Sequence, residues 1–166
     1  SQDQMNELKG TIDAMEVKIG TYTFDGDTPA SARKAVRSAG HIVVTNPDML
    51  HAGILPHHTI WIRLFENLEY VVIDEIHHYR GVFGSHLANV VRRLKRICAF
   101  YGSHPKFICC SATIANPQEM AERIIQVKCV RFDNPQFQLE TTFTEDDFTE
   151  KLVNNFHLNR ETVTAF

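Results

Sequence analysis

Two acidic residues, Asp74 and Glu75, directly follow the apolar run Tyr70–Ile73, and His77 and His78 come one residue later. A carboxylate at the end of a strand can hold Mg²⁺ beside the phosphates of a nucleotide, and a second carboxylate can polarise the attacking water. Side chains alternate along an ideal strand, so both acids reach one site only if the strand ends at Asp74. The same residues could instead bind a transition metal, or could simply end a strand in solvent.

The transition-metal interpretation would use His77 and His78, with Asp74 or His86 completing the set of ligands. The spacing of these histidines matches no zinc-protease pattern. Neighbouring histidines on an extended backbone would also point apart, because successive side chains leave opposite faces of a strand. We therefore rank a metal-dependent hydrolase below a nucleotide site.

Polar residues follow two other apolar runs in the same way. If the strands are parallel, their carboxyl ends meet at one edge of the sheet, which is where open α/β folds bind ligands. Three such clusters favour a site at that edge more strongly than one cluster does. The two further clusters are Thr45-Asn46-Pro47-Asp48 after residues 41–44 and Ser111-Ala112-Thr113 after residues 106–110.

The elements that must position these clusters alternate along the chain. Several strand candidates are apolar on both faces, which is typical of a mainly parallel sheet with helices on both faces. The sequence thus predicts an α/β fold. The spacing of apolar residues predicts helices over residues 2–15, 31–39, 57–67, 85–101 and 117–126, and strands over residues 17–24, 41–44, 70–74, 106–113 and 127–132.

Composition is that of an ordinary globular domain, with 43% hydrophobic and 22% charged residues among 166. The net charge of −3 argues against a generally basic nucleic-acid coat, although a local site depends only on where charges lie. No apolar stretch approaches the roughly 18 residues of a membrane span, and no secretory leader is visible. We expect no membrane partner, and a cytoplasmic protein (nuclear in a eukaryote) that is not secreted. Its four cysteines should be reduced.

The ordered set of segments resembles the superfamily 2 helicases of the DEAD/DEAH-box group. The string "VVIDEIH" resembles their motif II, "ICCSAT" motif III and "IVVTNPDML" motif Ib, while residues 1–4 resemble the tail of motif Ia. The longer strings "DEIHHYRGVFGSHLANVVRRLKRIC" and "SATIANPQEMAERI" are similar to the YprA-type branch of DNA helicases related to Lhr. This resemblance covers roughly residues 1–127 and implies a RecA-like lobe of the P-loop NTPase fold.

The resemblance also implies roles for individual residues. In such helicases, two RecA-like lobes clamp ATP and move along a nucleic-acid strand. Asp74 would hold Mg²⁺, Glu75 would activate the hydrolytic water and His77 would relay the nucleotide state. Ser111, Ala112 and Thr113 would couple hydrolysis to strand movement. Single-stranded or partly duplex DNA would lie along Thr45, Asn46, Asp48, Gly26, Asp27, Thr28 and Arg33.

The Gly-rich loop with Lys-Ser/Thr that cradles phosphates does not occur in the sequence. We interpret residues 1–132 as a partial first lobe, truncated at its N-terminus, whose missing phosphate-loop strand leaves a gap between the strands at 106–113 and 127–132. Residues 133–166 would form an acidic connector or the start of a further region. The fragment should be inactive alone and should need the second lobe. The alternatives are a noncatalytic lobe that binds nucleic acid or a partner, and a metal-dependent hydrolase using Asp74, His77 and His78.

Overall fold

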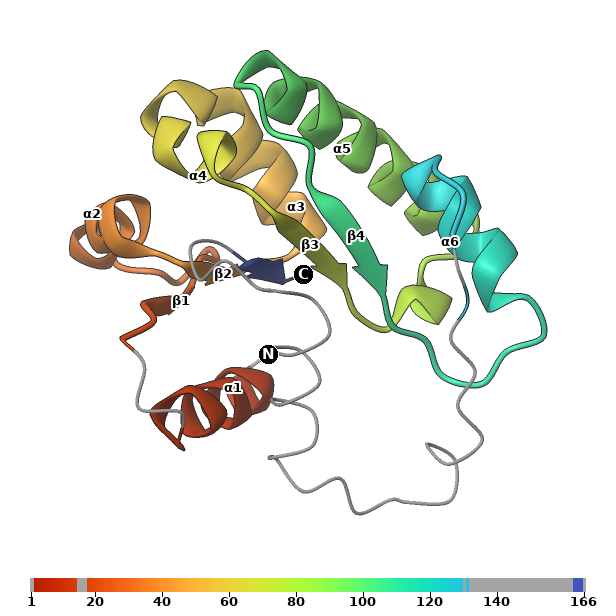
Figure 1. The fold of residues 1–166 in the computed structure, drawn as a ribbon, viewed down its shortest axis with the longest axis horizontal. Helices are drawn as coiled ribbons and strands as arrows, with labels where there is room; N and C mark the ends of the chain where they lie inside the picture. Colours follow the sequence, from red (N-terminus) through yellow and green to blue (C-terminus); the bar gives the residue numbers. More distant parts are fainter. Residues whose placement is uncertain (1, 15–17, 130, 132–162, 166) are drawn as a thin grey trace. The chain divides into compact units, whose positions relative to one another are not determined.

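The computed structural model describes residues 2–14, 18–129, 131 and 163–165 (Figure 1). Its contacts divide the chain into two compact units, one formed by Ser1–Lys18 with Val130–Arg160 and the other by Ile19–Cys129 with Glu161–Phe166. In the first unit the described element is helix α1 (Gln2–Ala14), in which Met5 and Ile12 are buried. The helix expected near residues 2–15 is therefore present.

The second unit contains a parallel sheet whose strand order is β1-β2-β5-β3-β4. Every strand pairing in it is parallel, as the apolar runs predicted. All three central strands start in register, since Ile42, Val163 and Tyr70 are aligned. The strands are β1 (Thr21–Thr23), β2 (Ile42–Val44), β3 (Tyr70–Ile73), β4 (Lys106–Cys109) and β5 (Val163–Ala165).

One strand of the sheet was not predicted, and one predicted strand is not formed. β5 comes from the part of the sequence left unassigned, and it pairs with β2 on one side and β3 on the other. The strand expected at 127–132 is not formed by the described residues Val127–Cys129 and Arg131, so the predicted gap beside it has no counterpart there.

The physical reason for the missing strand lies in helix α6 (Pro117–Ile125), which takes up the backbone groups of Cys129. Glu122 accepts a hydrogen bond from the Cys129 amide at 3.1 Å, and Gln118 donates one to the Cys129 carbonyl at 2.8 Å. Lys128 also donates to Glu122 at 3.0 Å. These hydrogen bonds, led by that from the Cys129 amide, lower the pKa of Glu122. Val127–Cys129 is therefore tied to the helix rather than to the sheet.

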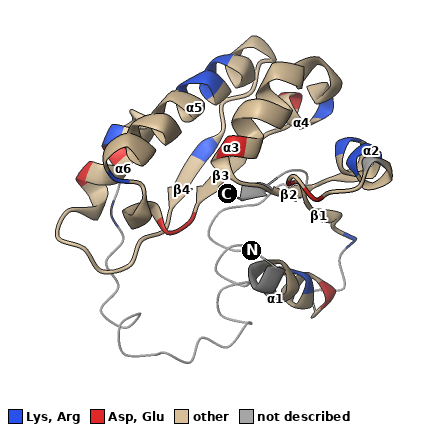
Figure 2. Cartoon of the chain, turned by 180° about the vertical axis from the view of Figure 1, so that it is seen from behind, with Lys and Arg blue, Asp and Glu red and all other residues tan. Residues whose placement is uncertain are grey.

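The longest helix, α5 (Gly81–Phe100), runs alongside β3 and β4 (Figure 1). It buries an apolar stripe and leaves Arg92 and Arg96 exposed. Figure 2 shows basic residues along this helix. It begins at Gly81 rather than at Ser85, because Gly81 adopts a φ of +58° that glycine allows and turns the chain into the helix early. The remaining helices and helical turns are α2 (Ala30–Ala39), α3 (Pro47–Met49), a π-helical turn (Leu50–Ile54), a 3₁₀ turn (Leu55–Ile60), α4 (Ile62–Glu66) and a 3₁₀ turn (Ile76–His78).

Aromatic contacts fix the core between the sheet and these helices. Trp61 is buried and meets the Phe24 ring edge-on at 4.8 Å, and Phe65 stacks on Tyr101 at 6.1 Å. Ile60 is 57% exposed, and the neighbouring Trp61, at the junction between the 3₁₀ turn and α4, is buried. Among the described residues, no helix is long and apolar enough to span a membrane.

Candidate functional site

The carboxyl ends of β3 and β4 lie side by side, which brings two of the predicted clusters together. Ile73 is aligned with Cys109 in the parallel pair. Beyond the strands the pairing continues, since the Cys110 amide donates to the Ile73 carbonyl and the Ile76 amide donates to the Cys110 carbonyl, each at 2.9 Å. The segment after Asp74 is therefore hydrogen-bonded to the segment that leads into Ser111.

The backbone at Glu75 leaves the strand in a left-handed conformation, with φ 49° and ψ 40°. Its amide donates to Asp74 Oδ1 at 2.8 Å. β3 ends at Ile73, so the alternation of a strand no longer separates the two carboxylates. This confirms the requirement stated from the sequence, that the strand stop at the first acid. Left-handed backbone costs a non-glycine residue of order 1–3 kcal/mol, and such conformations cluster at functional sites.

His77 connects the acidic segment to the segment after β4. Its Nδ1 accepts a hydrogen bond from the Ala112 amide at 3.1 Å. A nitrogen that accepts carries no proton, so the ring is neutral and its proton sits on Nε2. That nitrogen lies 3.1 Å from Glu75 Oε2. Nε2 of His77 therefore donates to the Glu75 carboxylate, while Nδ1 accepts from the Ala112 amide.

His78 lies closer to this group than the sequence indicated. The expectation that the neighbouring histidines point apart was wrong, because residues 76–78 form a 3₁₀ turn rather than extended backbone. The two imidazole rings are 4.1 Å apart, and His78 Nε2 is 3.9 Å from Glu75 Oε2. Glu75, His77 and His78 thus place three potential metal ligands within 4.8 Å of one another.

The tautomer of His77 nevertheless opposes a transition metal at this cluster. A metal bound at Nε2 needs the lone pair of that nitrogen, which moves the ring proton to Nδ1. The Nδ1–H would then face the Ala112 N–H, and the observed hydrogen bond between them would be lost. Metal capture and the contact between the two strand ends are therefore mutually exclusive for this residue.

The charge of the acids reaches their neighbours. Partial burial, followed by the charges of Asp74 and Glu75, raises the pKa of the Cys110 thiol. Burial, followed by the charges of Asp48 and Asp74, raises the pKa of Tyr79. The smaller, electrostatic part of each shift comes from these carboxylates, which make the carboxyl edge of the sheet negative. An oxygen ligand in a negative field is the environment that a hard cation such as Mg²⁺ prefers, so Asp74 fits that role.

The residues after β4 contribute differently from what the resemblance implied. Ser111, Ala112 and Thr113 are all exposed. The Ser111 hydroxyl donates locally to the Ala112 carbonyl at 2.9 Å. The contact with the acidic segment runs through the backbone amide of Ala112 instead. Coupling by the hydroxyls of Ser111 and Thr113 stays a prediction.

In the cluster after β2, Thr45 and Asn46 make hydrogen bonds within the fold, whereas the Asp48 side chain is exposed. The Thr45 hydroxyl is buried and donates to the Phe24 carbonyl at 2.6 Å, which fastens β2 to the segment after β1. The Asn46 side chain accepts from the Met49 amide at 2.7 Å and caps α3. The Asp48 side chain is 85% exposed and lies 3.1 Å from Nε2 of His86 on α5.

The turn after β1 holds the other residues implied in nucleic-acid binding. The Thr28 hydroxyl donates to Asp25 Oδ1 at 2.8 Å. Arg33 donates through Nε to the Thr28 carbonyl at 2.9 Å, and it lies over the Phe24 ring. Gly26 and Asp27 are exposed at the tip of the turn. The structure thus uses Thr28 and Arg33 to shape the turn, and their contact with nucleic acid stays a prediction.

Sequence reasoning missed Tyr79, and it considered His86 only as a metal ligand rather than as the partner of Asp48. His86 joins α5 to Asp48, and Tyr79 lies in the field of both Asp48 and Asp74. The only available signal was indirect, since both follow the acidic pair within one short stretch of sequence.

Three comparisons place this geometry among known proteins. Residues 1–121 match the family model of the DEAD/DEAH box helicases. The chain is 66% identical over 124 residues to the uncharacterized ATP-dependent helicase YprA of Bacillus subtilis. The aligned region covers 75% of the chain and 17% of that protein. It is 41% identical over 137 residues to the ATP-dependent helicase hrq1 of Schizosaccharomyces pombe, covering 81% of the chain and 13% of that protein.

Solved structures agree with the sequence relatives. A crystal structure of the DUF1998 helicase MrfA bound to DNA and AMPPNP has a TM-score of 0.78 and 62% identity, over 80% of this chain and 19% of that one. Another, of MrfA bound to DNA, has a TM-score of 0.75 and 64% identity, over 76% of this chain and 17% of that one. The chain spans less than a fifth of the length of these relatives.

Proposed function

Because the chain belongs to the DEAD/DEAH box helicase family, we propose that residues 1–132 are part of the first RecA-like lobe of an ATP-dependent DNA helicase or translocase. Residues 163–165 supply β5 of the same sheet, so the proposed acidic connector or further region is confined to residues 133–162. The observation that carries the proposal is the position of His77, which contacts Glu75 and the Ala112 amide at the same time. One side chain thereby links the acidic segment to the segment after β4.

In this proposal Asp74 is the ligand for Mg²⁺ and Glu75 polarises the attacking water. Bound Mg²⁺ would supply positive charge that offsets the charge on the phosphate oxygens of ATP. Asp74 also holds the amide of Glu75, and this contact fixes the left-handed turn that places the second carboxylate beside the first. The Nε2–H of His77 then orients the Glu75 carboxylate.

The same contacts provide a route for coupling. Any movement of the backbone at Ala112 changes the hydrogen bond to His77 Nδ1, and hence the orientation of the ring that holds Glu75. Strand movement that displaces residues 111–113 would therefore alter the position of the water-activating carboxylate. This role for Ala112 uses its backbone amide, so substitution of its side chain should matter little.

A chimera with the Bacillus subtilis relative tests the hydrolytic assignment. The matching residues of this chain would replace those of YprA, so that the lobe is studied in a protein of full length. Glu75→Gln should lower DNA-stimulated ATP hydrolysis by about 10²–10⁴-fold, the range for loss of a general base. Glu119→Gln, an exposed change of the same kind on α6, is the control. Unchanged hydrolysis in the Glu75→Gln chimera would refute the assignment.

The chain by itself should hydrolyse no ATP above background. No phosphate-cradling loop occurs among its 166 residues, so nothing would position the phosphates beside Asp74. The test compares ATP hydrolysis by the isolated chain, by the chimera and by its Glu75→Gln variant. Robust Mg²⁺-dependent hydrolysis by the isolated chain would contradict this expectation.

We also propose that DNA contacts the exposed residues after β1 and β2, chiefly Gly26, Asp27, Asn46 and Asp48. Small and polar residues suit contact with phosphates and carry little base preference. Asn46→Asp is a sharp test, because aspartate keeps the helix cap while placing a negative charge against phosphate. In the chimera this change should weaken DNA binding several-fold without lowering thermal stability. Equal affinity in both proteins would remove Asn46 from the interface.

A further inference from the structure

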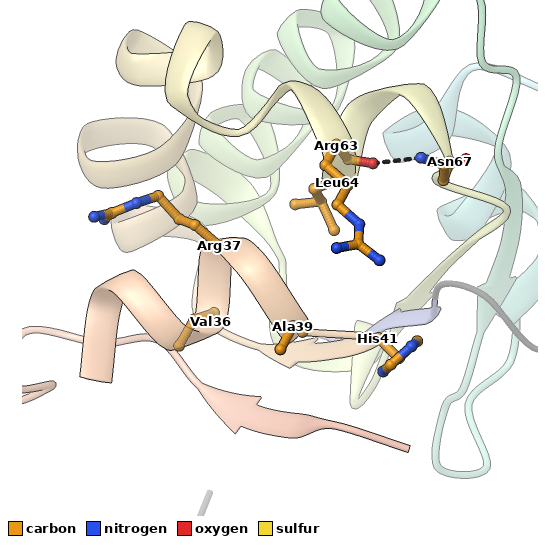
Figure 3. A pocket seen from close by; sticks show the side chains of 8 residues that line it. Val36, Arg37, Ala39, His41, Arg63, Leu64 and Asn67 are labelled. Atoms are coloured by element: carbon orange, nitrogen blue, oxygen red, sulfur yellow. Dashed lines mark hydrogen bonds between the residues drawn. The ribbon is translucent and has the colours of Figure 1, made fainter. Parts of the chain in front are cut away.

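A small cavity lies near the amino ends of the strands, whereas the acidic pair follows the carboxyl end of β3 (Figure 3). It has a volume of about 90 Å³ and lies between the end of α2 and helix α4. His41 directly precedes β2, and Asn67 lies just before β3, and these two strands start in register. The cavity is therefore at the amino ends of the strands, away from the proposed ATP and DNA contacts at their carboxyl ends.

The lining of this cavity is cationic. Arg37 and Arg63 supply its charge, His41 contributes a ring nitrogen, and no acidic residue lines it. The Arg63 side chain enters the space above His41, whereas Arg37 extends away from Arg63 at the rim (Figure 3). A positive lining without an acid to balance it attracts anions.

Two contacts hold the donors in place before any ligand arrives. Nη1 of Arg63 donates to the Ser38 carbonyl at 2.7 Å, which fixes the guanidinium and leaves its other N–H groups for a ligand. Nδ1 of His41 accepts from the Gly20 amide at 3.0 Å, so the ring carries its proton on Nε2 and can donate from there. Donors fixed in advance lose less entropy when they bind.

The C-terminus of α2 opposes anion binding at this cavity, and Arg63 reduces that effect. The last carbonyls of α2 carry the partial negative charge of a helix C-terminus. Arg63 donates a hydrogen bond to the Ser38 carbonyl, so this carbonyl of the helix end already has a donor.

We propose that this cavity binds a single oxyanion group, either a phosphate or a carboxylate, held by Arg63 and His41. Its size decides the class of ligand. Pockets for cofactors and drug-sized molecules measure roughly 300–1,000 Å³. A cavity of about 90 Å³ admits one anionic group but not a nucleotide. The ligand is therefore separate from the ATP of the proposed function, and the inference stands whether or not that function is correct.

The test is a titration of the 166-residue chain followed by NMR of its arginine Nε–H groups, with sodium chloride keeping the ionic strength constant. Inorganic phosphate and acetate are titrated separately. The Arg63 signal, assigned by its loss in Arg63→Lys, should shift and saturate. Saturation with phosphate alone supports a phosphate ligand, and saturation with acetate as well supports a carboxylate. A signal that does not saturate with either anion by about 100 mM, where the Debye length is about 10 Å, overturns the proposal.

Variants separate the pocket from general surface charge. Arg63→Gln should weaken the binding, followed through the remaining arginine signals, by about 10–100-fold, since hydrogen bonds to charged groups contribute about 1.5–3 kcal/mol and 1.4 kcal/mol is tenfold. Arg37→Gln, at the rim, should weaken it by less, and this variant guards against a folding defect from the loss of the Ser38 contact. The control Arg96→Gln removes the same charge from an exposed site on α5. Equal losses in all three variants would overturn the assignment to this cavity.

Discussion

The left-handed backbone at Glu75 predicts an unusual order of stability among substitutions at a proposed catalytic residue. With φ 49° and ψ 40°, any residue with a Cβ is strained here by about 1–2 kcal/mol relative to right-handed backbone. Glycine avoids that strain but loses about 0.5–1 kcal/mol through the greater freedom of the unfolded chain. Glu75→Gly should therefore be more stable than Glu75→Ala by about 0.5–1 kcal/mol.

The comparison with alanine is what isolates the backbone. Both substitutions remove the same contacts of the Glu75 side chain, to Nε2 of His77 at 3.1 Å and Nε2 of His78 at 3.9 Å. Their difference therefore reports the conformation alone. For a chain of this size, 1 kcal/mol corresponds to about 2–4 °C in Tm, so the expected separation is about 1–4 °C.

Thermal unfolding of both variants, followed by circular dichroism, measures this separation. Gln126 is the matched site, because it is the other non-glycine residue with positive φ in the described part of the chain, at 53°, and no catalytic role is proposed for it. Gln126→Gly should also exceed Gln126→Ala. Arg96, inside α5 and exposed, should show the reverse order, since alanine is the better helix former. If Glu75→Ala melts at or above Glu75→Gly while the two control sites behave as described, the reasoning about Glu75 is refuted.

Three further predictions concern the stability and reactivity of the chain. Thr45→Val should destabilise it by about 1–3 kcal/mol in urea unfolding, because the Phe24 carbonyl loses its buried donor, while Thr113→Val at an exposed position should stay within about 0.5 kcal/mol. The hydrogen bonds to Glu122 lower the pKa of its carboxyl from 4.5. Its contribution to the free energy of unfolding is therefore present above pH 4.5 and is lost as the pH falls through the pKa of the folded state. Glu122→Gln should make the loss of stability with falling pH less steep below pH 4.5. Burial raises the pKa of Cys98 to about 11, so at pH 8 roughly a thousandth of it is thiolate, and maleimide should label it only as the chain unfolds.

The sequence predicted the edge at which the acids and the Ser-Ala-Thr segment meet, because parallel strands have only one carboxyl edge. Apolar runs and the acids that interrupt them are local signals, and they located β2, β3 and β4 correctly. The wrong predictions concern segments whose secondary structure depends on contacts with residues outside the segment. Residues 127–129 have strand-like composition, yet the side chains of α6 hold the backbone of Cys129. No local pattern could show that.

The details of the site were less predictable than its place. The left-handed turn at Glu75 follows from the requirement that two adjacent carboxylates share a site, and that requirement could be stated in advance. The closeness of His77 and His78 could not, because it depends on the 3₁₀ turn that follows Glu75. The tautomer of His77 depends in turn on Ala112, which is distant in sequence.

Polar residues at this edge of the sheet divide into two groups that their types do not distinguish. The hydroxyls of Thr45 and Thr28 make hydrogen bonds within the fold. Thr45 donates to the Phe24 carbonyl and Thr28 donates to Asp25. Thr113, the same residue type, is exposed and makes no hydrogen bond within the described part of the chain. If the Thr45 hydroxyl turned to a ligand, the Phe24 carbonyl would be left without this donor, which costs about 1–3 kcal/mol. In the proposed function, Thr45 would therefore act on nucleic acid only by shaping the turn, and direct contact would fall to exposed residues such as Asn46 and Asp48.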